Sequence, residues 1–277
     1  MITLLRRATA VCALSTALAA CGTTHPPRAA TSPVPAPPPR PPTLAPGPTG
    51  LTPVFEHGPR TRGRTVALTF DADMTAGQGA RAAAGERFDH PRLISTLRAL
   101  KVRATVFMTG RWAEEYPAQA RSIGRDPLFE VANHSYSHYA YTPDCYGLPT
   151  VPEERRRSDV ERAYAALRKA GVRDPLPYFR FPGGCYDRRA LKALAPTGVT
   201  AVQWDVVGGD AFETDPDVVA RQVLDEVRPG SVVVLHCTRS AAPATERAVR
   251  TIVPELRRRG FRFVKVSELI EAVGNRP

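Results

Sequence analysis

Two histidines four positions apart, His134 and His138, have the spacing that points most directly to chemistry in this 277-residue chain. The i, i+4 spacing places both imidazoles on one face of a helical turn, where both can bind one metal ion. Asp71 and Asp73 follow an apolar run upstream, and His236 ends another apolar run downstream. Two imidazoles and one carboxylate leave an open position for water on a zinc ion, so these residues predict a hydrolytic metal site.

The elements that would position these residues alternate between β-rich and helical patterns from residue 64 onward. Apolar strands that alternate with helices indicate a parallel sheet covered by helices, and about seven repeats favour closure as a barrel. We therefore expect an α/β fold, a distorted (β/α)7-type barrel, with the polar motifs at the carboxyl ends of its strands. The expected strands are 65–70, 104–108, 129–132, 178–181, 200–204, 231–235 and 261–264, and the expected helices are 90–100, 112–123, 152–170, 187–194, 215–227 and 245–259.

The first residues have the pattern of an export signal. Arg6 and Arg7 precede an apolar stretch at 8–20 that is too short to span a bilayer. The Leu-Ala-Ala-Cys sequence that ends at Cys21 resembles a bacterial lipobox, in which the cysteine becomes the lipidated N-terminus. An ordinary signal peptide with an incidental cysteine is the alternative. We expect a lipoprotein signal over 1–21 and a protein anchored by lipid to the outer face of the cell membrane.

A proline-rich segment follows this signal. Twelve of the 28 prolines of the chain lie between Pro26 and Pro53. This composition favours extended polyproline II and cannot bury a core, so we predict a tether over 22–60 and a folded domain over 61–277. The formal charge is +11, but the basic residues are scattered and no nucleic-acid motif is present, so we expect no nucleic-acid partner.

Five short motifs within 64–270, taken in order, resemble those of the polysaccharide deacetylase family, the NodB-like carbohydrate esterases. The first is Thr-Phe-Asp-Ala-Asp at 69–73, similar to the family's Thr-Phe-Asp-Asp-Gly, and the resemblance implies that Asp71 is the catalytic base. Ala72 stands where the family has a metal-binding Asp. We predict that Asp73 supplies this carboxylate, because side chains at i and i+2 share a face of a strand. The alternative is a site with two protein ligands and weak metal affinity.

The next two motifs imply the metal ligands and the oxyanion hole. His134 and His138 match the family's metal-binding His-x-x-x-His, with zinc as the expected ion and cobalt or another divalent ion as the alternative. Arg-Phe-Pro-Gly at 180–183 is similar to the family's Arg-Pro-Pro-Tyr. By this resemblance Arg180 orients the base, and the backbone N–H of Gly183 forms part of the oxyanion hole, although the aromatic side chain of the family is lost.

The last two motifs imply a general acid. In the sequence at 204–211, Asp210 takes the place of the Asp that hydrogen-bonds the catalytic histidine, and Ala211 replaces the family's pocket Trp. His236, in a Leu-His pair, matches the general acid, and Asp210 would raise its pKa. Trp204 either lines the groove or belongs to the core.

Three cysteines remain in the predicted domain. Outside the cytoplasm thiols tend to pair. Cys145 and Cys185 each lie in a loop just after a candidate motif, so we predict a disulfide between them, and we interpret Cys237 as a small buried apolar residue. The insertion at 75–88, rich in Gly and Ala, is expected to form a loop over the site.

Together these features predict a monomeric, metal-dependent hydrolase that removes acetyl groups from N-acetylated glycans. Cell-wall peptidoglycan is the expected substrate, because an exported and tethered enzyme meets it first. Two alternatives stay open. One is an O-acetyl esterase that acts on xylan or wall esters. The other is a non-catalytic wall-binding lipoprotein, which is favoured by the missing second Asp and the two lost aromatic side chains.

Overall fold

The computed structural model describes residues 40–274, and the segments 1–39 and 275–277 lie outside it. The predicted signal sequence, the lipidation site at Cys21 and the first part of the predicted tether therefore lie outside the described residues. Within the described part, no helix has the length and apolar character needed to cross a membrane.

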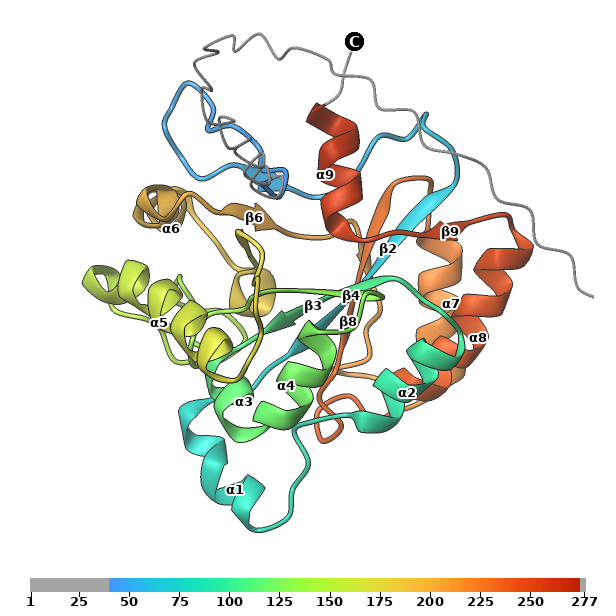
Figure 1. Cartoon of the computed structure of the whole chain (residues 1–277), viewed down its shortest axis with the longest axis horizontal. Helices are drawn as coiled ribbons and strands as arrows, with labels where there is room; N and C mark the ends of the chain where they lie inside the picture. The colour runs from blue at the N-terminus through green and yellow to red at the C-terminus, as the bar shows by residue number, and fades with distance from the viewer. Residues whose placement is uncertain (1–39, 275–277) are drawn as a thin grey trace, which may run out of the picture. The chain divides into compact units, whose positions relative to one another are not determined.

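A parallel sheet forms the centre of the described domain, and helices flank it (Figure 1). The strand order is β1-β6-β5-β4-β3-β2-β8-β7, with β9 paired to β2. All pairings are parallel, which confirms the predicted α/β fold, and the sheet curls into a half-barrel with edges at β1 and β7. The strands are β1 (Val54–Phe55), β2 (Thr65–Ala72), β3 (Ala104–Met108), β4 (Phe129–Asn133), β5 (Tyr178–Phe179), β6 (Thr200–Val202), β7 (Val206–Val207), β8 (Ser231–His236) and β9 (Arg262–Phe263).

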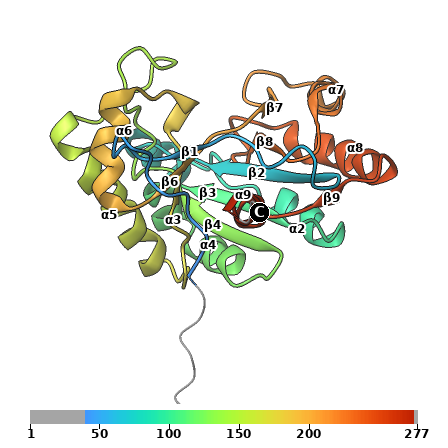
Figure 2. The same cartoon turned by 90° about the horizontal axis from the view of Figure 1, so that it is seen from above.

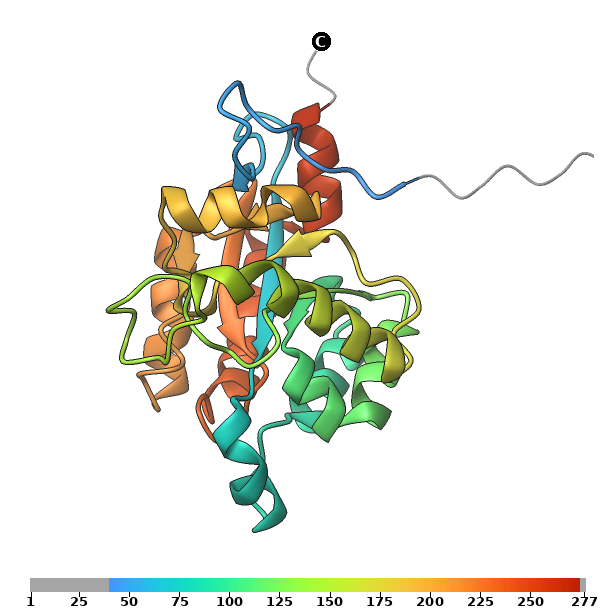
Figure 3. The same cartoon turned by 90° about the vertical axis from the view of Figure 1, so that its left-hand side faces the viewer.

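The helices gather in groups around this sheet. Seen from above, α5 and α6 lie on one side and α7 and α8 on the other (Figure 2), and a side view shows α5 and α6 in front of the central strands (Figure 3). The helices are α1 (Gly79–Ala83), α2 (Pro91–Ala99), α3 (Gly110–Glu115), α4 (Pro117–Gly124), α5 (Arg156–Lys169), α6 (Arg188–Leu194), α7 (Pro216–Glu226), α8 (Thr245–Arg258) and α9 (Val266–Gly274), with 3-10 turns η1 (Ala76–Gln78), η2 (Glu153–Arg155), η3 (Pro182–Gly184) and η4 (Ala195–Thr197).

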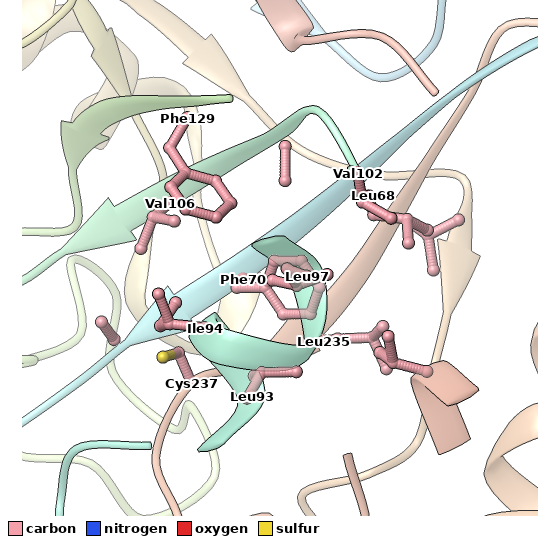
Figure 4. Packing of buried hydrophobic residues seen from close by; sticks show 14 of the residues in the cluster. Leu68, Phe70, Leu93, Ile94, Leu97, Val102, Val106, Phe129, Leu235 and Cys237 are labelled. Carbon is pink, nitrogen blue, oxygen red and sulfur yellow. The ribbon is translucent and has the colours of Figure 1, made fainter. Parts of the chain in front are cut away.

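The central strand β2 divides its side chains between two apolar clusters. Leu68 and Phe70 pack in the outer cluster against Leu93 and Leu97 of α2 (Figure 4). Because side chains of a strand alternate, Asp71 points to the opposite face, toward the inside of the half-barrel. The strand that contributes Leu68 and Phe70 to the core therefore also presents a carboxylate near its carboxyl end.

The predicted helix at 112–123 is wrong as a single element, because the structure has two helices there. Tyr116, with φ −120° and ψ 56°, both ends α3 and precedes α4, and Pro117 opens α4. Proline lacks a backbone N–H and clashes with a preceding helical turn, so a proline in this position favours a break. The short strands β1 and β7 and the helices α1 and α9 were not predicted.

Ordered contacts begin before the predicted domain boundary at residue 61. β1 pairs with β6, the N–H of Leu44 donates to Thr200 Oγ1 at 3.0 Å, and the hydroxyl of Tyr178 donates to the Pro42 carbonyl at 2.7 Å. Proline cannot donate to a ladder but its carbonyl can accept, so a proline-rich run is tolerated at a sheet edge. The second part of the predicted tether thus belongs to the fold.

Candidate active site

The carboxyl ends of neighbouring strands bring the candidate residues together. Asp71 in β2 is the direct register partner of His236 in β8. β4 ends at Asn133, immediately before His134, and β5 ends immediately before Arg180. Parallel strands that are paired in register end at one edge of the sheet, which is where such folds place their sites.

These strand ends surround a cavity of about 330 Å³. Six of the predicted site residues line it: Asp71, Asp73, His134, His138, Gly183 and His236. The prediction that the insertion at 75–88 forms a loop over the site is wrong, because these residues do not line the cavity. Residues 76–83 instead form η1 and α1, and α1 extends away from the strands (Figure 1, Figure 3).

The Asp71 carboxylate is fixed by a buried arginine. Arg180, which is fully buried, donates from Nη1 to Asp71 Oδ1 at 2.7 Å and from Nε to the Val202 carbonyl at 3.2 Å. Its guanidinium lies 4.0 Å from the centre of the Phe107 ring. Burial lowers the pKa of Arg180, and the Asp71 charge opposes this effect. Asp71 Oδ2 faces His134 Nε2 at 3.6 Å, and Asp71 lines the cavity.

His134 and His138 do not lie on a helical turn, and that part of the prediction is wrong. They follow β4 in an irregular loop in which Ser135 (φ 69°) and His138 (φ 55°) are left-handed. The carbonyls of Ser135 and Tyr136 accept hydrogen bonds from the N-terminal residues of α3, so they are engaged away from an i, i+4 helical ladder. The loop nevertheless brings the two imidazole rings to 5.0 Å between centroids.

Both imidazoles are in the state that a metal ligand requires. His134 Nδ1 lies 3.0 Å from the Arg180 carbonyl, which can only accept, so Nδ1 carries the proton and Nε2 offers its lone pair to the cavity. Burial lowers the pKa of His134, and burial lowers the pKa of His138 to about 4. Both rings are therefore neutral at neutral pH.

Asp73 enters the same cavity from just beyond the end of β2. Its Oδ2 lies 3.9 Å from His138 Nε2, and its Oδ1 accepts a hydrogen bond from the Thr238 hydroxyl. Burial alone would raise the pKa of Asp73, but His138, His236 and Thr238 lower it, so the carboxylate is ionised. Ala72, by contrast, is fully buried in the outer apolar cluster and contributes nothing to the cavity.

The donor atoms fit a divalent ion in chemistry, and the distance between Asp73 and His138 can be compared with what one ion requires. Two ligand atoms on one tetrahedral zinc ion lie about 3.3 Å apart, given bonds of about 2.0–2.1 Å. The separation between Asp73 and His138 is 3.9 Å. Within residues 40–274, no three His, Cys, Asp or Glu side chains converge tightly enough to enclose an ion as they stand. For one ion to bind both residues, the spacing between Asp73 and His138 would have to contract by roughly half an ångström.

His236 is held by Asp210 on the other side of the cavity. His236 Nδ1 lies 2.9 Å from Asp210 Oδ1, and the His236 backbone N–H donates to Oδ2 at 2.8 Å. The Thr245 hydroxyl also donates to Oδ2, at 2.6 Å. Burial lowers the pKa of His236, but the Asp210 carboxylate outweighs this effect and raises it to about 10. The ring is therefore protonated at neutral pH, as a proton donor must be.

The surroundings of Gly183 leave no room for a side chain such as the aromatic one that the resemblance implies at this position. Its backbone is left-handed (φ 67°), and a Cβ built on it would lie 2.6 Å from Cys145 Sγ and 3.2 Å from the Tyr146 ring.

The predicted disulfide between Cys145 and Cys185 is present, with the sulfurs 2.06 Å apart. Cys237 is buried and has no disulfide partner in the described part of the chain.

Several residues around the cavity were not identified from the sequence. Thr238 contacts Asp73 and Thr245 holds Asp210, and the only sequence signal for Thr238 is its place two residues after His236. Tyr146 and Phe212 also line the cavity. Trp204 is partly buried against the apolar cluster that contains Phe107, Tyr178 and Val202, and it lines the cavity as well, so both interpretations of it apply.

Several known proteins are similar to this chain in sequence and in fold. A profile of the polysaccharide deacetylase family matches residues 58–202, just over half of the chain. A chitooligosaccharide deacetylase from Bradyrhizobium sp. (strain ANU 289) is 29% identical over 217 residues, which cover 74% of this chain and 90% of that protein. A solved peptidoglycan N-acetylglucosamine deacetylase has 25% identity and a TM-score of 0.66, over 79% of this chain and 94% of that chain. A CE4 family pseudoenzyme from Bacillus anthracis shares the fold, with 23% identity and a TM-score of 0.63 over 83% of this chain and 70% of that one.

Proposed function

Because this chain belongs to the polysaccharide deacetylase family, we propose that it is a metal-dependent hydrolase that removes acetyl groups from N-acetylated glycans, with cell-wall peptidoglycan as its substrate. One observation carries this proposal. A single cavity contains an oriented carboxylate, Asp71, two neutral imidazoles and a protonated histidine, His236. The names of the relatives support glycan deacetylation as the activity.

Asp73, His134 and His138 are the residues that would hold the ion, which we propose to be zinc or another divalent ion such as cobalt. When bound, such an ion supplies a Lewis acid that polarises the acetyl carbonyl. The protein keeps both imidazoles neutral through burial and fixes the His134 tautomer through the Arg180 carbonyl. The Thr238 hydroxyl restricts the orientation of the Asp73 carboxylate.

The remaining residues move protons and hold charge. Asp71 accepts the proton of the water that adds to the acetyl carbonyl carbon, while Arg180 orients this carboxylate. The Gly183 N–H stabilises the oxyanion, a contribution of about 3–4 kcal/mol for one such donor. The C–N bond then breaks as His236 donates its proton to the amine nitrogen, which gives acetate and a free amine. Asp210 is a positioning residue that holds His236 protonated.

The decisive experiment measures acetate release by the purified protein. The substrates are peptidoglycan, N-acetylglucosamine oligomers and acetylated xylan, each with and without a chelator. We expect release from the two N-acetylated substrates, loss of release with chelator and recovery with added zinc. Release from xylan alone would make the protein an O-acetyl esterase.

The alternative of a non-catalytic wall-binding protein rests on Ala72, which stands where the family has its metal-binding Asp. Wall binding without acetate release from any substrate, with metal added, would establish it. The matched variants His134→Ala and His236→Gln separate the parts of the site. The first should lose both zinc and activity, and the second should keep zinc and lose activity.

We also propose that the protein acts as a monomer on the outer face of the cell membrane, anchored by lipid at Cys21. The lipobox-like sequence at 18–21 and the proline-rich segment after it support this proposal. Labelling of cells with a fatty acid probe tests the anchor, because Cys21→Ala should abolish the label. Label retained on this variant would exclude the anchor at Cys21.

A further inference from the structure

Aromatic side chains stand at the mouth of the cavity although the family's pocket aromatics are absent at Gly183 and Ala211. Three large apolar side chains are exposed in the described part of the chain: Tyr146 (74%), Val207 (42%) and Phe212 (82%). All three line this one cavity. Exposed apolar groups that gather at a cavity, rather than singly over a surface, mark a ligand groove.

Tyr146 and Phe212 form a pair. Their ring centroids are 6.1 Å apart and their planes are inclined by 39°. Neither ring is buried in a core, so the pair contributes little apolar burial to the stability of the fold. Both rings keep most of their surface free for another molecule.

The loop that carries Tyr146 has an unfavourable backbone conformation. Asp144 (φ 58°), Tyr146 (φ 49°) and Gly147 (φ 70°) are all left-handed. Such conformations at non-glycine residues persist where surrounding contacts impose them, and they concentrate at functional sites. Here the contacts are the disulfide from Cys145 to Cys185 and the hydrogen bond from the Leu148 N–H to the Cys145 carbonyl.

The two rings lie near Gly183 and Ala211, the positions where the aromatic side chains of the family are absent. A Cβ at residue 183 would lie 3.2 Å from the Tyr146 ring, so glycine at this position makes room for Tyr146. Phe212 directly follows Ala211, in a turn closed by the hydrogen bond from the Phe212 N–H to the Gly209 carbonyl at 3.0 Å. Each of the two rings therefore occupies the neighbourhood of a position where the family's side chain is missing.

Resting on the function proposed above, we propose that Tyr146 and Phe212 form a carbohydrate-binding platform. It takes the pyranose ring next to the sugar that loses its acetyl group. A pyranose ring presents C–H groups on its faces, and these pack against the negative face of an aromatic ring. The cavity of about 330 Å³ is at the small end of ligand pockets, so a longer glycan must extend over its rim. Tyr146, Val207 and Phe212 carry no charge, which suits a neutral sugar.

The test compares Tyr146→Ala, Phe212→Ala and the double variant on N-acetylglucosamine dimer and tetramer. Each single change should raise KM for the tetramer about five- to tenfold with kcat nearly unchanged. The unaltered protein should prefer the tetramer, and the double variant should lose this preference. Tyr146→Phe and Phe212→Tyr keep an aromatic face and should retain KM. Tyr146→Leu and Phe212→Leu keep apolar volume only and should not.

Binding of the tetramer, measured by calorimetry on the unaltered protein and on the double variant, separates this inference from the proposed function. Suppose that the unaltered protein binds the tetramer and releases no acetate, while the affinity of the double variant for the tetramer is lower by about tenfold or more. This result would support the platform and contradict the deacetylase function. An active protein whose double variant keeps its KM and its tetramer affinity would overturn the platform, and so would an unaltered protein that does not bind the tetramer. Equal thermal unfolding of all variants is expected, since both rings are exposed.

Discussion

Removal of the guanidinium of Arg180 should show how strongly the fold depends on the ion pair at the site. Arg180→Met keeps an apolar stem but removes the hydrogen bonds to Asp71 at 2.7 Å and to the Val202 carbonyl at 3.2 Å. Asp71 is only 3% exposed, so it would become a buried carboxylate without its ion-pair partner. Breaking a buried pair in this way costs about 3–5 kcal/mol, because the remaining charge is desolvated and uncompensated.

A double-mutant cycle measures this coupling. Asp71→Asn removes the opposite charge, and the combined variant leaves neither charge unpaired. We expect the free energy of unfolding of the double variant to fall by about 1–3 kcal/mol less than the sum of the two single losses. Urea unfolding followed by circular dichroism gives all four values. Arg180→Lys is the conservative control, and it should recover only part of the stability, since an ammonium cannot reproduce the planar fork.

Activity should be lost in both single variants, through Asp71 directly and through its orientation by Arg180. A free energy of unfolding of Arg180→Met within about 1 kcal/mol of that of the unaltered protein would contradict this expectation, because a buried unpaired carboxylate should cost more. Additive losses in the two single variants would contradict it as well, because they would mean that the two charges do not interact.

Three further predictions concern the rest of the site. The pKa of His236 is raised to about 10 in the folded protein, against an ordinary value of about 6.5, so its stabilising contribution is complete below pH of about 6.5 and is lost as the pH rises through about 10. Unfolding free energies measured across that range should show the decline, and His236→Gln should remove it. Replacing Cys145 and Cys185 by Ala opens a loop of 40 residues and should cost about 4 kcal/mol by chain entropy, measured by urea unfolding; an unchanged midpoint would refute this. Asp73→Ala should weaken zinc binding by about tenfold or more in a chelator competition, whereas Asp205→Asn, outside the cavity, should not.

The arrangement of the strands was predictable because it depends on local patterns. Apolar runs at 65–70, 104–108 and 231–235 are long enough to be strands, and each ends where the polarity changes. Parallel pairing brings the carboxyl ends of such strands to one edge of the sheet. This rule, together with the family resemblance, is why Asp71 and His236 could be placed in one site. The disulfide was predictable for a similar reason, since both of its cysteines follow motifs of that site.

The parts that could not be predicted depend on contacts between distant segments. The His134 loop leaves the helical conformation because its carbonyls bond to α3, a partner that its own sequence does not reveal. β1 is an edge strand of two residues in a proline-rich run, and local composition there favours an extended spacer. Tyr146 and Phe212 meet only through the folding of two separate loops, so neither carries a pattern of its own.

Restoring the family's carboxylate at residue 72 tests which residue completes the metal site. Ala72 is fully buried in the outer cluster with Leu68 and Phe70, on the face of β2 away from the cavity. An Asp there would be a charge without a partner, so Ala72→Asp should destabilise the fold by about 3–5 kcal/mol and leave zinc affinity unchanged. In the Asp73→Ala background it should likewise fail to recover zinc binding. If Ala72→Asp were instead as stable as the unaltered protein and bound zinc more tightly, the chain would leave β2 with residue 72 facing the cavity. Asp73 would then not be the third ligand.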